Sequence, residues 1–278
     1  LHHRHFLEDW QFLSKKINAA NQNLDWRAAY LLLKYPIKQG VLEGFEKFVK
    51  QNTKGNLMSR PDTYYIDLYS TFSTINCCRE FRELYERIVA DPEFGKEILE
   101  DSGVTRTDEE AQWIQVPEHW NKLPPYVRFK AIVAKRIFDE NKEVREAVKR
   151  HLEKDIDDNT REYGGVFEYQ RKKRRWILTD VPPISGSGSN SSFFGQEDPL
   201  WRASPFAFHQ HAENGGGKIC AGPGERDLIM TNKTQKTHFL VTSINETQIN
   251  VDLISYDETR TPASYGWEID LGVFETGH

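Results

Sequence analysis

The sequence predicts an α/β protein with a helical first half and a strand-rich second half. In the first half, apolar residues recur every three or four positions, which is the spacing of one face of a helix. In the second half, short runs of β-branched and aromatic residues alternate with turn-forming residues, as in strands. The change falls at residues 155–159. We therefore expect two domains, an α-helical domain at 1–154 and a strand-containing domain at 155–278.

Helix signals are spread over the whole first half. Asp25 is placed to cap the first helix and Pro36 to end it. Pro92 suits the first turn of a later helix, with Gly103 as its end. The longest pattern has apolar residues spaced for a single buried face. The expected helices cover residues 26–33, 41–49, 81–88, 92–103 and 126–152.

The second half has strand signals interrupted by one short helix, which we place around Leu228 after Gly224. Two loops flank one of the strands, a Ser- and Gly-rich loop at 185–192 and a run of glycines at 215–217. No internal repeat is present. The expected strands cover residues 163–169, 176–181, 205–211, 239–244, 249–256 and 267–274.

Composition sets broad limits on function. A chain of 278 residues with 38% hydrophobic residues can bury one large core or two smaller ones. The net charge of −5 argues against a general nucleic-acid binder, and no apolar run approaches the roughly 20 residues that span a membrane. Residues 1–5 lack the apolar region of a signal peptide. The three cysteines form no disulfide framework, so we expect folding in a reducing compartment such as the cytoplasm.

Two histidines and an aspartate form the most informative pattern in the chain. His209 and His211 are one residue apart at the end of an apolar run, so in a strand they point to the same side. Asp227 follows sixteen positions after His211 and can complete a three-ligand site if the chain folds back. Two imidazoles and one carboxylate suit Zn²⁺, with a fourth position left for water. Glu162, at the start of an expected strand, is a candidate proton carrier for that water.

These residues, in this order, resemble the signature of the JAMM metalloproteases. In that family a glutamate precedes a glycine-containing strand, and a His-x-His pair is followed by an aspartate. The Glu-Tyr-Gly-Gly form at residues 162–165 is most similar to a JAMM-like domain carried by bacterial polymorphic toxins. The resemblance covers roughly residues 155–275 and leaves the helical half unrecognised. It implies a mixed β-sheet with flanking helices for the second domain.

The resemblance also implies roles for four residues. His209, His211 and Asp227 correspond to zinc ligands, and Glu162 to the residue that activates the bound water. The implied reaction is hydrolysis of a peptide or isopeptide bond in a protein substrate. The implied setting is a bacterial effector, secreted or injected, or a protease that processes its own polyprotein.

Three departures from the JAMM pattern separate this chain from an ordinary member. Ala212 replaces the proline that follows the second histidine, and the spacing to Asp227 is longer than usual. Gly224 stands where the family has a serine that helps to stabilise the oxyanion. The last departure favours an alternative function, a non-catalytic JAMM-like domain that binds protein partners. A zinc deaminase is a third reading, but such enzymes carry a Cys-x-x-Cys that is missing here.

Three other features have a plain interpretation and a functional one. Cys220 is a buried, inert cysteine or a substitute zinc ligand. The basic run at residues 171–175 is a solvated hairpin or a surface for an acidic partner. Trp201 and Phe194 are packing residues or contacts for substrate side chains. His238, just before a strand, is expected to be a core or surface histidine.

Overall fold

The computed structural model describes residues 39–53, 60–99, 114–115, 117–157, 162–181, 198–211, 221–256 and 266–276. The chain forms a mixed α/β structure, as the sequence predicts. Its helices are α3 (Gln39–Asn52), α4 (Asp62–Ile75), α5 (Arg79–Ala90), α6 (Pro125–Glu140), α7 (Lys142–Asp157), α8 (Pro199–Ala203) and α9 (Glu225–Thr234), with short 3-10 turns at Lys96–Ile98 and Pro117–Lys122. Its strands are β1 (Ile114–Gln115), β2 (Gly164–Gln170), β3 (Arg175–Val181), β4 (Ala207–His211), β5 (His238–Asn245), β6 (Gln248–Tyr256) and β7 (Gly266–Glu275).

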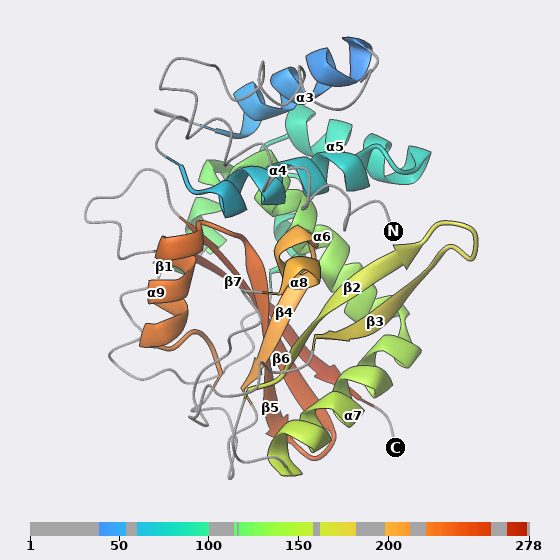
Figure 1. Cartoon of the computed structure of the whole chain (residues 1–278), viewed down its shortest axis with the longest axis vertical. Helices are drawn as coiled ribbons and strands as arrows, with labels where there is room; N and C mark the ends of the chain where they lie inside the picture. The colour runs from blue at the N-terminus through green and yellow to red at the C-terminus, as the bar shows by residue number, and fades with distance from the viewer. Residues whose placement is uncertain are drawn as a thin grey trace.

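The strands of the described residues form one mixed sheet in the order β1-β7-β6-β5-β4-β2-β3. The pairs β1–β7 and β4–β5 are parallel, and the other neighbours are antiparallel. Figure 1 shows α3, α4 and α5 gathered at one end of the sheet, with α7 running beside β3 and α9 on the opposite flank. Strand β4 therefore lies inside the sheet, between β2 and β5.

One large buried apolar cluster joins the helices to the sheet. Phe138 of α6 contacts Phe167 of β2 at 5.4 Å between ring centroids, and Phe274 of β7 at 5.2 Å. Phe81 of α5 lies 6.0 Å from Trp176 of β3. Burial of aromatic side chains of this size is a major source of folding free energy. Residues on both sides of position 155 belong to this cluster, while the domain boundary expected there stays a prediction.

The second face of the sheet carries α8 and α9. Trp201 of α8 is fully buried there, in a smaller cluster with Val166 of β2, Ala207 of β4 and Met230 of α9. The helix α8 is short, and Asp198 caps it by accepting hydrogen bonds from the N–H groups of Leu200 and Trp201. This face is the one that bears the two histidines of β4.

The strand predictions agree with the structure to within two residues at each end, and the helix predictions differ in two places. The stretch at 126–152 is two helices, because Asn141 ends α6 in a non-helical conformation (φ −117°, ψ 86°) and its carbonyl opens α7. The helix expected at 92–103 is wrong over its described part, 92–99: Gly95 has φ +86°, and only a short 3-10 turn follows. The helix expected at 26–33 lies outside the described residues.

Other sequence expectations concern surfaces. The basic run at 171–175 is exposed and forms the turn between β2 and β3 together with the first residue of β3. In it, Arg174 pairs with Glu80 and Arg175 with Glu143. In the described part of the chain, no helix has the length and apolar character required to cross a membrane.

Candidate metal centre

Strand β4 presents His209 and His211 on one face of the sheet. Because side chains alternate along a strand, the intervening Gln210 points to the other face, where its amide oxygen lies 3.1 Å from Nδ1 of His151. His209 is paired with Gly164 of β2 and with Leu240 of β5, so the strand is fixed from both sides. The pairing sets the register of both histidines.

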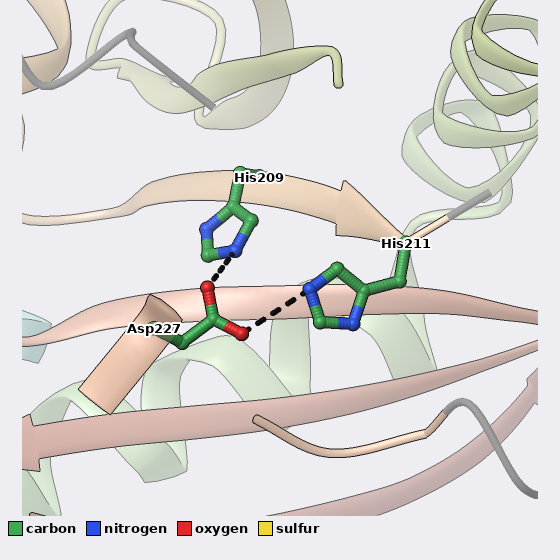
Figure 2. Close-up of side chains that lie close together, drawn as sticks. All are labelled: His209, His211 and Asp227. Carbon is green, nitrogen blue, oxygen red and sulfur yellow. Dashed lines mark hydrogen bonds and ion pairs between the residues drawn. The ribbon is translucent and has the colours of Figure 1, made fainter. Parts of the chain in front are cut away.

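Asp227 reaches the same face from the first turn of α9. Its carboxylate lies 2.7 Å from Nε2 of His209 through Oδ1, and 3.3 Å from Nε2 of His211 through Oδ2 (Figure 2). The N–H of Gly224 also donates to Oδ2, at 2.8 Å, which anchors the aspartate at the start of the helix. Candidate ligand atoms of the three residues lie within 4.8 Å of one another.

Burial differs across the three side chains. His209 is fully buried, Asp227 is 9% exposed and His211 is 15% exposed. Solvent therefore meets the cluster from the side of His211. The three side chains would offer two nitrogens and one oxygen to a metal ion, the ligand set of catalytic zinc sites that keep a further position for water.

The charge state of Asp227 suits a metal ligand. Burial by itself raises the pKa of a carboxyl group, but the adjoining His209 and His211 outweigh burial and hold the pKa of Asp227 well below its usual range. The carboxylate is therefore ionised at neutral pH. An ionised carboxylate beside two imidazoles is available as a ligand for a divalent cation.

The strand β2 brings Glu162 toward this site. The antiparallel register pairs Gly164 with His209, and the N–H of Gln210 donates to the carbonyl of Tyr163 at 3.0 Å. Glu162 precedes Tyr163, so it adjoins the last backbone hydrogen bond that joins this segment to β4. Glu162 is half-buried. It is not one of the three residues whose ligand atoms lie together in the described part of the chain.

One of the two glycines that begin β2 has a packing reason. A Cβ at Gly165 would lie 2.8 Å from the ring of Phe208 and 2.8 Å from the carbonyl oxygen of Thr179. Neither neighbour can move easily, since Phe208 is fully buried and Thr179 is in the adjacent strand. Gly165 thus allows β2 and β4 to pair closely, and it belongs to the scaffold of the site.

A third histidine, His238, packs against the ring of His209. The ring of His238, the first residue of β5, stacks on His209 with 5.4 Å between centroids. Its Nδ1 lies 3.2 Å from the carbonyl of Lys236. Burial and then the neighbouring His209 lower the pKa of His238 to about 3, so this ring is neutral at pH 7. Of the two positions expected from the sequence, core and surface, the structure shows the core one, and no sequence pattern signals the contact with His209.

Of the two roles considered from the sequence, packing and substrate contact, Trp201 has the packing role. It is fully buried and its Nε1–H donates to the carbonyl of Phe208 at 3.0 Å, directly before His209. It also lies 5.7 Å from the ring of His238. A residue in this position cannot reach a substrate. Phe194, Ala212, Cys220 and the glycines at 215–217 lie outside the described residues.

Comparison with known proteins adds no family to this picture. No protein-family model matches the sequence, and neither curated proteins nor solved structures give a match.

Proposed function

We propose that His209, His211 and Asp227 bind one Zn²⁺ and that the chain is a zinc-dependent peptidase or isopeptidase. The observation that carries the proposal is the convergence of two imidazole nitrogens and an ionised carboxylate at one partly open site. Two nitrogens and one oxygen are the protein ligands of many catalytic zinc sites. The resemblance of the same residues to the JAMM signature supports the choice of amide hydrolysis.

Each residue has a defined part in such a reaction. Zinc, when bound, lowers the pKa of water to about 7 and polarises a substrate carbonyl. Glu162, which adjoins the backbone hydrogen bond between Tyr163 and β4, accepts a proton from the attacking water and returns it to the leaving amine. The hydrogen bond from Gly224 holds the Asp227 carboxylate in place. The full burial of His209 keeps that side of the site dry.

A second function, binding of protein partners without catalysis, is favoured by the surroundings of Gly224. Glycine offers no hydroxyl to an oxyanion, and its own N–H already donates to Oδ2 of Asp227. A donor for the oxyanion must therefore come from another group. Loss of one such donor typically costs about 3–4 kcal/mol of transition-state stabilisation.

Metal content tests the proposal directly. Elemental analysis of protein purified without added metal should give close to one zinc per chain, and replacing both His209 and His211 by alanine should remove it. His119→Ala is the control, because His119 packs near Trp267 rather than near Asp227, and it should keep the zinc. A wild-type zinc content in the double variant would contradict the assignment of His209 and His211 as ligands. Cleavage of peptide and isopeptide panels that stops with chelator separates the enzyme from the binding domain.

A further inference from the structure

A buried group of charges lies between the helices and the sheet. The carboxylate of Asp67, in α4, accepts from Nζ of Lys130, in α6, at 2.6 and 2.7 Å. It also accepts from Nζ of Lys236 at 3.2 Å and from the N–H of Thr237 at 3.3 Å. Lys236 and Thr237 lie in the segment between α9 and β5. One carboxylate thus ties two helices of the first half to the entry of β5.

Such a cluster is expensive to bury. Asp67 is 1% exposed and both lysines are fully buried. Burial lowers the pKa of Lys130 to about 8, against the opposing effect of Asp67. Charged groups are retained in this setting only when their hydrogen bonds are well satisfied. The other hydrogen bonds of the two lysines therefore show which parts of the fold this cluster stabilises.

Besides Asp67, the two lysines bind different backbone carbonyl groups. Nζ of Lys130 turns to the carbonyl of Thr237 at 3.3 Å. Nζ of Lys236 donates to the carbonyl of Ser204 at 2.6 Å and to that of Arg202 at 3.4 Å. These carbonyls form the end of α8, where a positive charge is favourable. The same ammonium lies 5.4 Å from the centre of the Trp201 ring.

From Trp201 the contacts continue to the metal centre. The indole N–H binds the carbonyl of Phe208, next to His209, and the indole ring packs on His238. His238 in turn stacks on His209. Lys236 is therefore connected to the orientation of His209 through α8, whereas Lys130 touches neither α8 nor its tryptophan by any hydrogen bond in the described residues.

We propose that Lys236 is a positioning residue of the metal centre: fixed by Asp67 of the helical half, it holds α8 so that Trp201 and His238 orient the His209 imidazole. This inference rests on the proposed metal site. It makes the helical half a part of that site, because the carboxylate that fixes Lys236 comes from α4.

Two matched variants test it. Lys236→Met and Lys130→Met each remove one ammonium from the same carboxylate and leave one lysine–aspartate pair in place. Zinc affinity is measured by competition with a chromophoric chelator, and the melting temperature is measured without metal. Loss of a residue that orients a ligand typically weakens metal binding about 10–100-fold. We expect a loss of this size in Lys236→Met and less than about threefold in Lys130→Met.

Cobalt(II) in place of zinc supplies a readout that general instability would not move. Its visible bands follow ligand geometry, so they should shift in Lys236→Met and stay unchanged in Lys130→Met. Equal affinities and equal spectra in the two variants overturn the inference while leaving the metal site intact. A wild-type protein that binds neither ion overturns the metal site itself.

If Lys236→Met does not fold, Trp201→Phe decides the question. It keeps an aromatic ring and removes the N–H that binds the carbonyl of Phe208, together with part of the buried indole ring system. Weakened zinc binding with a shifted cobalt spectrum supports the chain of contacts. Wild-type affinity in Trp201→Phe overturns it.

Discussion

Asp227 serves two parts of the structure with one carboxylate. Oδ1 faces His209, while Oδ2 faces His211 and also accepts the N–H of Gly224. The residue that would bind the metal therefore also fixes the start of α9. Because the neighbouring imidazoles keep its pKa well below the usual range, the carboxylate stays charged from neutral pH into the acid range.

The charge on Asp227 predicts how metal affinity depends on pH. Zn²⁺ binds the unprotonated form of an imidazole, so protons compete with zinc for histidine ligands. The low pKa of Asp227 keeps its carboxylate ionised, so this ligand adds little to the competition. Zinc affinity should be highest near about pH 8 and fall steadily toward about pH 5.5. Chelator competition at several pH values measures it, and a flat profile would contradict ligation by His209 and His211.

Glu162 is the residue whose removal separates chemistry from metal binding. Glu162→Gln keeps the shape of the side chain but removes its ability to accept a proton. Zinc content should remain at the wild-type level while turnover falls by roughly 10²–10⁴-fold. The matched control is Glu168→Gln, farther along β2, whose carboxylate binds Thr179. Loss of zinc in Glu162→Gln would make it a ligand, and a wild-type rate would remove it from the reaction.

At the scale of elements, the N-terminus of α9 is where the chain departs most from the JAMM pattern. The backbone conformation at Gly224 is nevertheless compatible with a residue that has a side chain. Gly224 has φ −87° and ψ 174°, which any residue can adopt. Among the described residues, a Cβ at this position would meet Oδ2 of Asp227 alone, at an ordinary 3.7 Å. Serine is also a favourable residue at the start of a helix. Packing therefore gives no reason for glycine here.

Gly224→Ser tests whether the missing hydroxyl limits hydrolysis. Gly224→Ala is the matched control, because it adds the same Cβ without an oxygen. If the site lacks an oxyanion donor, Gly224→Ser should raise peptide hydrolysis by roughly 10²–10³-fold with zinc content unchanged, and Gly224→Ala should not. Equal rates in the two variants of an active protein would mean that another group already serves the oxyanion. Inactivity of wild type and both variants would favour the binding domain.

Elements also show how far local sequence signals reach. Strands β2 to β7 could be predicted because runs of β-branched and aromatic residues mark them directly, whereas the two-residue β1 has no such run. Helix α4 was not predicted, because its serines and threonines obscure the apolar spacing. In the structure, the hydroxyl groups of Thr71 and Thr74 donate to backbone carbonyls one turn earlier in the helix. The break at Asn141 was not predicted either, because the apolar period continues across it from Ile137 to Val144.

At the scale of the whole molecule, the sequence could predict the candidate ligands but not what supports them. His209 and His211 share a strand, so their common face follows from alternation alone. The ties from Asp67 to Lys236 and from Trp201 to Phe208 depend on how distant elements pack, and no local pattern encodes them. The same packing joins α6 and the sheet in one apolar cluster. Residues on the two sides of the expected domain boundary therefore share this cluster.

A fragment of residues 155–278 decides whether the second half is an independent domain, as the change of period predicts. Removing the earlier helices would expose the sheet face that Phe138 covers and would leave Lys236 without Asp67. We therefore expect a soluble fragment to behave as a molten globule, with secondary structure retained, near-ultraviolet circular dichroism lost, a fluorescent dye for exposed apolar surface bound, and zinc held weakly. The full chain, measured in parallel, should unfold cooperatively. Cooperative unfolding of the fragment with wild-type zinc affinity would establish the boundary near residue 155 and would show that the buried charge cluster is dispensable to the metal centre.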